Sequence, residues 1–291
     1  MGSTFGLYAC LINKSNYIEI KSVLRINEKE IMETLVKQSL SNNVFIIDAA
    51  FYMPQLGRNR RIWLYLPPEY STSKQHYPVL YMHDGQNLFE DSSAFGEEWG
   101  VDESLNALNG KCIVVGIDNG LEKRINEYTV HDGAPYGNGE GNAYLSFVVQ
   151  TLKPYIDETY RTLEGREHTF IAGSSLGALI SFYAMLYYPH VFSAAGIFSP
   201  AFWIAPGLLD ETKHLAGQNQ TMPQRFYFYY GEKEGHEMAA NARAIMDVLK
   251  AIPQYKVKAV IDPEGTHSEA NWRIAFTSYY KWMMQKEKRS R

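Results

Sequence analysis

The sequence is poor in cysteine, in excess positive charge and in long apolar runs, and each absence excludes a class of protein. Only two cysteines, Cys10 and Cys112, occur in 291 residues, so neither a disulfide framework nor a Cys/His zinc site is expected. The 28 Lys and Arg residues against 32 Asp and Glu residues give a net charge of −4, which argues against a nucleic-acid partner. No apolar run reaches the roughly 18 residues that would predict a membrane-spanning helix.

Aromatic side chains, in contrast, are plentiful: they make up 14% of the chain and include 21 tyrosines. Tyrosine combines an apolar ring with a polar tip, so these residues suit a wet cleft as well as a packed interior. A chain of this length buries about three quarters of the surface that its unfolded form exposes. The composition therefore predicts a globular protein that needs no covalent staples.

The first 40 residues are predicted to form an extension of the main domain. The apolar run 5–12 lacks a preceding Lys or Arg, so it is a poor secretory signal and is better interpreted as a strand. Residues 25–40 carry apolar side chains at helical spacing among charges, which predicts a short amphipathic helix. Residues 41–291 are expected to form the one main domain. The expected location is cytoplasmic if the chain is complete, and secreted or periplasmic if a leader was removed.

Short apolar runs alternate with helical stretches along the rest of the chain, which is typical of a mostly parallel sheet with helices on both faces. The expected strands are 43–51, 61–66, 78–82, 112–117, 169–172, 194–198, 226–230 and 256–261. The expected helices are 102–108, 143–158, 177–188, 238–251 and 271–285. The predicted fold class is α/β, with about eight strands. The glycine-rich segment 118–142 has no helical period and predicts a functional lid or a disordered excursion.

The strongest chemical signal is Gly173-Ser174-Ser175-Leu176-Gly177, directly between an expected strand and an expected helix. A serine at such a sharp turn has a strained backbone, and small flanking residues allow the turn to close. Its hydroxyl stands at the positive end of the following helix, where a developing oxyanion is stabilised. Ser175 is therefore the candidate nucleophile; the alternative is a glycine-rich turn needed for packing alone.

A serine hydroxyl is a weak nucleophile and needs a histidine base, which with this motif comes late in the chain. His267 lies in a loop after the expected strand 256–261, at the carboxyl edge where active sites of open α/β sheets gather. His236 follows an earlier strand. We therefore predict His267 as the base and interpret His236 as a polar loop residue.

The third group must orient the imidazole and stabilise its charged form, which is a role for a carboxylate after the preceding strand. The segment Gly231-Glu232-Lys233-Glu234 follows the expected strand 226–230 and offers two. Residues two apart in a turn are hard to separate by sequence. Glu232 and Glu234 are both candidates at this point, ahead of Asp262 and Glu264.

Acyl transfer also requires two donors for the charged oxygen of the tetrahedral intermediate. One is expected to be the backbone N–H of Leu176, and the other comes from the loop after an earlier strand. The run 79–87 (VLYMHDGQN) supplies that loop: Gly85 permits close approach, and Gln86 presents its N–H. His83 and Asp84 are expected to hold the loop through hydrogen bonds rather than to bind metal.

Four runs carry a family resemblance: 61–70 (RIWLYLPPEY), 77–89 (YPVLYMHDGQNLF), 173–178 (GSSLGA) and 198–203 (FSPAFW). In combination they resemble the esterase D-like, or putative-esterase, branch of the α/β-hydrolase superfamily. That branch includes feruloyl, acetyl-xylan and siderophore esterases, S-formylglutathione hydrolase and mycobacterial mycolyltransferases. Many members have a second glycine where this chain has Ala178, a small change that leaves the turn feasible.

The resemblance implies an α/β-hydrolase fold and ester hydrolysis through an acyl-enzyme on Ser175, with no metal or organic cofactor. It favours Glu234 as the acid, because the superfamily usually places the acid three residues after the glycine. The expected substrate is a feruloyl or acetyl ester of a carbohydrate. The alternative is a siderophore ester or a thioester such as S-formylglutathione, and a sugar-binding relative without activity is the third.

Aromatic residues in loops at the same sheet edge are expected to border the substrate. They are Tyr128, Phe202, Trp203 and Trp272. The alternative for Trp203 and Trp272 is that they are packing anchors. The expected partner is a small molecule or carbohydrate ester.

Overall fold

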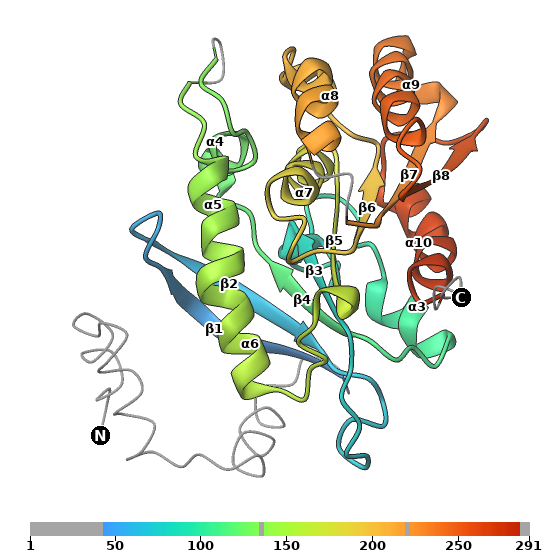
Figure 1. Ribbon diagram of the computed structural model, residues 1–291. Helices are drawn as coiled ribbons and strands as arrows, with labels where there is room; N and C mark the ends of the chain where they lie inside the picture. The colour runs from blue at the N-terminus through green and yellow to red at the C-terminus, as the bar shows by residue number, and fades with distance from the viewer. Residues whose placement is uncertain (1–42, 134–136, 219–221, 286–291) are drawn as a thin grey trace.

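An eight-stranded sheet with helices on both faces forms the centre of the molecule in the computed structural model, which describes residues 43–133, 137–218 and 222–285 (Figure 1). The strands are β1 (Val44–Met53), β2 (Arg58–Tyr65), β3 (Val79–His83), β4 (Ile113–Ile117), β5 (Thr169–Ser174), β6 (Ala194–Phe198), β7 (Gln224–Gly231) and β8 (Tyr255–Asp262). Their order across the sheet is β1-β2-β4-β3-β5-β6-β7-β8. Among these strands the pairs β1–β2 and β2–β4 are antiparallel, and all the other pairs are parallel. The predicted α/β-hydrolase fold is confirmed.

Helices connect the strands and cover the sheet. They are α3 (Val101–Ala107), α4 (Arg124–Glu127), α5 (Gly141–Phe147), α6 (Lys153–Thr159), α7 (Leu176–Tyr187), α8 (Leu208–Gln218), α9 (His236–Lys250) and α10 (Glu269–Met283). Short 3₁₀ turns occur at η1 (Gly85–Asn87), η2 (Leu121–Lys123), η4 (Arg166–His168), η5 (Phe202–Ile204) and η6 (Glu232–Glu234). A π-helical turn, η3 (Val148–Leu152), joins α5 to α6. It precedes Pro154, which has no N–H to donate in the first turn of α6.

Two apolar cores lie on opposite faces of the sheet. One contains side chains of α5, α7 and α9, and the other contains side chains of α3 and α10. Adjacent residues in the central strands belong to different cores: Ile171 points to the first, whereas Phe170 and Ala172 point to the second. This alternation follows from the period of two along a strand, and burial on both faces explains why these strands are continuous apolar runs.

The strands and helices expected after residue 42 all occur, with ends shifted by a few positions. In α9 the buried residues include Ala242, Ile245, Met246 and Leu249, the side chains spaced three or four apart in the sequence. Helix α8 was not among the expected helices, although Leu208, Leu209 and Leu215 place apolar side chains at helical spacing along it. The expected extension 1–40 lies outside the described residues. Within the described residues, no helix is long and apolar enough to cross a membrane.

The described part of the segment 118–142 is not a disordered excursion, which was one of the two alternatives expected for it. This part contains α4 and returns two side chains, Glu127 and Tyr128, to the interior, where both are 0% exposed. Arg60 on β2 pairs with the Glu127 carboxylate at 2.6 Å, which offsets the cost of burying that charge. Arg60 and Glu127 are 67 positions apart in the chain, so no local sequence pattern indicates that they pair.

Candidate active site

Ser175 occupies the sharp turn between β5 and α7, with φ 57° and ψ −120°. A non-glycine residue at positive φ is strained and persists only where the surroundings hold it. Its N–H donates to the Phe198 carbonyl at 2.9 Å, and its carbonyl accepts from the Ala201 N–H at 3.1 Å. A Cβ at Gly173 would lie 2.7 Å from the Gly177 carbonyl oxygen. Gly173 is therefore needed because the strand and the helix cross at contact distance.

Glu234 and His267 come together at the carboxyl ends of β7 and β8. His267 Nδ1 lies 2.7 Å from Glu234 Oε2, and the Glu234 side chain is 0% exposed while that of His267 is 39% exposed. Glu234 Oε1 accepts hydrogen bonds from the Gly231 N–H at 2.6 Å and the Ser199 hydroxyl at 2.8 Å. With Nδ1 engaged by the carboxylate, Nε2 is the ring nitrogen that is left to face a reacting hydroxyl.

A close glycine contact brings these two loops together. A Cβ at Gly231 would lie 2.1 Å from the Gly265 carbonyl oxygen, and the Lys233 N–H donates to that same oxygen at 3.2 Å. Glu232, Asp262 and Glu264 form no hydrogen bond or ion pair with His267 in the described part of the chain. His236 is exposed at the start of α9. The structure thus brings Glu234 to His267 and leaves the other candidates apart.

Ser199, in the loop after β6, links the loop after β7 to the first turns of α10, and sequence reasoning missed it. It is completely buried at φ 46°. Its hydroxyl donates to Glu234 and accepts a hydrogen bond from the Trp272 indole N–H at 2.8 Å. The only sequence signal is its place, a small polar residue directly after a buried strand that ends at the carboxyl edge of the sheet.

The two predicted oxyanion donors lie at the starts of neighbouring helical turns. Leu176 begins α7, and Gln86 lies in η1 directly after β3. Among the described residues, neither N–H donates to a backbone group outside the helices and strands, and N–H groups in a first helical turn have no intrahelical partner. Gly85 permits the close approach, because a Cβ there would lie 2.8 Å from the end of β4 at Gly116. The Gln86 side chain accepts a hydrogen bond from the Asn119 N–H at 3.1 Å.

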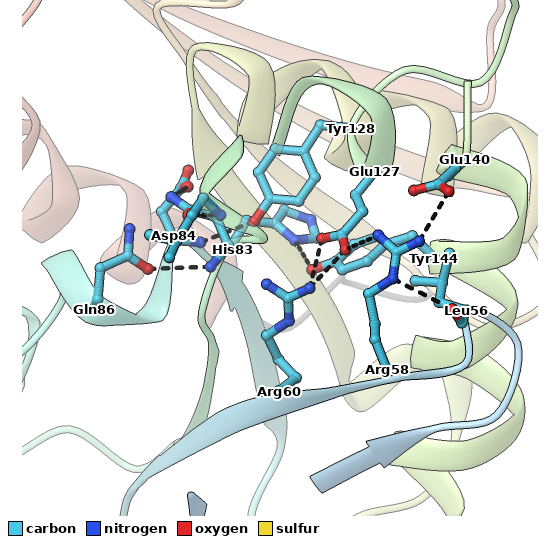
Figure 2. Close-up of polar contacts among 12 residues, drawn as sticks. Leu56, Arg58, Arg60, His83, Asp84, Gln86, Glu127, Tyr128, Glu140 and Tyr144 are labelled. Atoms are coloured by element: carbon cyan, nitrogen blue, oxygen red, sulfur yellow. Dashed lines mark hydrogen bonds and ion pairs between the residues drawn. The ribbon is translucent and has the colours of Figure 1, made fainter. Parts of the chain in front are cut away.

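A buried polar cluster supports this loop from behind (Figure 2). His83 Nδ1 shares a hydrogen bond with the Tyr144 hydroxyl at 2.8 Å, and the Asp84 N–H donates to the Tyr128 hydroxyl at 3.2 Å. Burial lowers the pKa of His83 to about 3, so this ring is neutral at physiological pH. The expected role of His83 and Asp84 in holding the loop agrees with these contacts. Within the described residues, no group of three His, Cys, Asp or Glu residues is placed to bind a metal ion.

Three of the four aromatic residues expected beside the substrate are buried. The expectation for Tyr128 is wrong, because its ring is 0% exposed and packs between His83 and Tyr144. Phe202 is 3% exposed and packs on Phe182 of the core. Trp272 is also 3% exposed and meets the His267 ring edge-on at 5.0 Å, which fits the packing alternative.

Trp203 is 38% exposed and lines a cavity of about 390 Å³. The cavity lies between the segments 129–133 and 203–207, with Tyr183 of α7 at its base. Both segments start at the candidate site, since Tyr128 bonds to the loop before Gln86 and Ala201 bonds to Ser175. The volume of the cavity is in the range of small-molecule pockets.

The fold and the serine turn at the carboxyl edge of its sheet define the class of protein, an α/β hydrolase. The chain belongs to the family described as "Putative esterase", whose model matches residues 53–283, and it is a carboxylic ester hydrolase. It is 31% identical over 202 residues to the uncharacterized protein YbbA of Bacillus subtilis, which covers 67% of this chain and 77% of that protein.

Solved structures share the fold at lower sequence identity. A ferulic acid esterase superposes with a TM-score of 0.65 at 16% identity, over 83% of this chain and 98% of that one. The enterobactin esterase of Shigella flexneri also has a TM-score of 0.65, at 20% identity, over 79% of this chain and 57% of that one. At such identities the likeness establishes the shared architecture.

Proposed function

We propose that Ser175, His267 and Glu234 form the catalytic triad of this esterase. The observation that carries the proposal is the Glu234–His267 contact of 2.7 Å at the same carboxyl edge of the sheet as a serine held at positive φ. His267 Nε2 takes the Ser175 proton as Oγ attacks the ester carbonyl, and the buried Glu234 carboxylate stabilises the resulting imidazolium. The N–H groups of Leu176 and Gln86 hold the developing oxyanion.

The reaction then completes in two steps. Collapse of the tetrahedral intermediate breaks the ester C–O bond, and His267 returns the proton to the leaving alcohol. Water attacks the acyl-Ser175 carbonyl while His267 accepts one of its protons, and the second collapse releases the carboxylic acid and restores the Ser175 hydroxyl. No other reactant is consumed.

The cavity beside Trp203 suggests where the acyl group lies. The leaving alcohol must receive its proton from His267, so it departs on the side of the loops after β7 and β8. The residues that line the cavity come from other segments, so the acyl chain extends toward Trp203. Tyr183 follows Leu176 by seven residues, which is about 10 Å along α7. An arylpropenoyl group such as feruloyl spans this distance better than acetyl does.

We therefore propose a feruloyl-type ester of a carbohydrate as the substrate. The fold shared with a ferulic acid esterase supports this choice. An acetyl ester of a carbohydrate is the smaller alternative of the same class. A siderophore ester is the second candidate, supported by the fold shared with an enterobactin esterase.

Steady-state kinetics on methyl ferulate, p-nitrophenyl acetate and a catecholate trilactone test both parts of the proposal. Ser175→Ala is expected to lower kcat by about three to six orders of magnitude on whichever esters the enzyme hydrolyses. Trp203→Ala is expected to raise KM for methyl ferulate about tenfold while changing kcat/KM for p-nitrophenyl acetate by less than about twofold.

Tyr52→Ala is the matched control, since Tyr52 is an exposed aromatic residue on β1, 49% exposed. It is expected to leave kcat and KM for all three substrates unchanged. Activity that survives in Ser175→Ala contradicts the triad. A kcat/KM for the trilactone about a hundredfold above that for methyl ferulate makes the siderophore ester the substrate instead.

A further inference from the structure

The Asp84 carboxylate is buried in the loop that carries the Gln86 N–H. Asp84 adopts the left-handed conformation, φ 56°, between β3 and η1. Arg124 of α4 donates to it twice, from Nε to Oδ1 at 2.7 Å and from an Nη to Oδ2 at 2.8 Å. The Asn119 side chain adds a third hydrogen bond, to Oδ1, at 2.7 Å. The Asp84 side chain is 6% exposed and that of Arg124 is 27% exposed.

This carboxylate also faces the start of α7. A Cβ at Gly177 would lie 3.1 Å from Asp84 Oδ2, and Gly177 follows Leu176, the other proposed oxyanion donor. A full negative charge therefore lies at the helix N-terminus where a second negative charge would develop during ester attack. Helix N-termini stabilise anions, but two like charges at short range in a partly buried site repel each other strongly.

Arg124 cancels this charge. Burial alone raises the pKa of Asp84, but the Arg124 charge and the hydrogen bonds from Arg124 and Asn119 together bring it below its usual value. Asp84 is thus ionised at neutral pH, and the Asp84–Arg124 pair as a whole is neutral. The Arg124 guanidinium also lies over the Tyr128 ring, 5.4 Å from its centroid. This contact helps to hold the Arg124 side chain in place.

A charged pair is a costly way to attach a loop. Buried ion pairs lose much of their attraction to desolvation, and apolar contacts anchor a loop at least as well. The loop already has uncharged anchors in the hydrogen bonds of His83 and of the Asp84 N–H to two buried tyrosines. The second ionic group nearby, in which Arg58 and Arg60 bind Glu127, makes no hydrogen bond to Asp84 among the described residues (Figure 2).

We infer that Arg124 is a positioning residue for ester hydrolysis. It holds Asp84 so that the Gln86 N–H points at the oxyanion, and it neutralises Asp84 so that the oxyanion bound by the Leu176 N–H meets no second negative charge. The inference rests on the proposed function, because it assigns Arg124 a part in the same oxyanion site. It predicts that the Asp84 charge lowers kcat only when Arg124 is removed.

Three variants separate charge from attachment. Arg124→Met leaves the Asp84 carboxylate uncompensated and is expected to lower kcat for p-nitrophenyl acetate about 10²- to 10³-fold, with KM changed less than about threefold. Arg124→Lys retains the charge but loses the paired hydrogen bonds, so its kcat should fall between those of Arg124→Met and the parent. The double variant Asp84→Asn with Arg124→Met removes the repulsion, so its kcat should be at least about tenfold higher than that of Arg124→Met.

Inhibition by phenylboronate provides a readout that loss of stability alone would not move. Boronate forms a negatively charged tetrahedral adduct with the serine, so its Ki should rise in Arg124→Met in proportion to the loss of kcat. Arg58→Met is the matched control, because its side chain has the same 27% exposure and pairs with Glu127 and Glu140 instead. It is expected to lower the melting temperature and leave kcat and Ki unchanged.

The inference is overturned if Arg124→Met keeps kcat and Ki within about threefold of the parent, or if the double variant is no more active than Arg124→Met. Failure of the proposed function looks different. In that case the parent enzyme would resist phenylboronate, and Ser175→Ala would hydrolyse p-nitrophenyl acetate as fast as the parent does.

Discussion

At the scale of single residues, the candidate site depends on how fully one carboxylate is engaged. Each Glu234 oxygen has a defined partner: Oε2 contacts His267, and Oε1 accepts from Ser199 and from the Gly231 N–H. Such a carboxylate holds the imidazole in one orientation and one tautomer. Glu232, two residues earlier, is exposed and has no comparable surroundings.

Conservative amide substitutions distinguish these two carboxylates. Glu234→Gln preserves size but offers a neutral group to His267, so kcat for p-nitrophenyl acetate should fall about 10³- to 10⁴-fold. Glu232→Gln should leave kcat within about twofold of the parent enzyme. Circular dichroism on both variants verifies the fold. A larger loss in Glu232→Gln than in Glu234→Gln would show that the acid has been misassigned.

At the scale of secondary-structure elements, β7 and β8 control the site by ending against each other. The two strands pair in parallel up to Gly231 and Asp262. Just beyond, the backbones of Gly231 and Gly265 touch, and the loops that carry Glu234 and His267 diverge from this contact. The loop after β8 also rests on α10 through the Trp272 indole, which contacts His267 and, in the loop after β6, Ser199.

A single methyl group at this contact should separate the loops. Gly231→Ala would place Cβ 2.1 Å from the Gly265 carbonyl oxygen, so the backbone must move. We expect the free energy of unfolding to fall by about 1–3 kcal/mol and kcat to fall with it. Urea denaturation and steady-state kinetics measure the two effects.

Gly207→Ala is the control for this substitution, because a Cβ at Gly207 meets no atom within 4 Å. Its free energy of unfolding should stay within about 0.5 kcal/mol of the parent value. Equal stability of the two variants would mean that the strand ends tolerate separation, and the glycine contact would then be no constraint on the site.

At the scale of the whole molecule, the sheet is held between two apolar cores, and one carboxyl group is buried at the edge of the second. Asp102 in the first turn of α3 is 5% exposed, and its Oδ1 has no hydrogen-bond partner in the described part of the chain. Burial and, next, the neighbouring Glu103 raise the pKa of Asp102 well above its usual value. The folded protein therefore retains a proton that the unfolded chain releases.

This shift makes stability depend on pH with a definite sign. Above about pH 4 an unfolded chain ionises Asp102, while the folded protein still binds the proton, so stability falls as pH rises. Asp102→Asn is neutral in both states. We expect it to flatten the dependence between about pH 4 and pH 8 and to raise the free energy of unfolding at pH 8 by about 1 kcal/mol or more.

Urea denaturation at several pH values measures this effect. Asp210→Asn serves as control, since the Asp210 side chain is 87% exposed, and it should follow the parent curve. Parallel curves for Asp102→Asn and the parent would show that Asp102 ionises alike in the folded and unfolded states.

The sequence predicted the parts of this molecule that depend on neighbours in the chain. Buried parallel strands appear as apolar runs, and α9 shows its buried face through residues three and four apart. The expected helices omitted α8, although its leucines are helically spaced, and α4, which at four residues is too short to show a period. Tyr128 was expected at the substrate because of the position of its loop, and a sequence pattern does not indicate whether an aromatic ring is exposed or buried.

The sequence by itself determined the serine turn, because a strand, two glycines and a helix start within a few residues specify that local backbone. It also determined the order in which serine, carboxylates and histidine reach the carboxyl edge of the sheet. Only the tertiary structure decided which carboxylate meets His267, what supports it, and what neutralises Asp84. Those contacts join residues 33, 35 and 40 positions apart, and they depend on where whole loops pack.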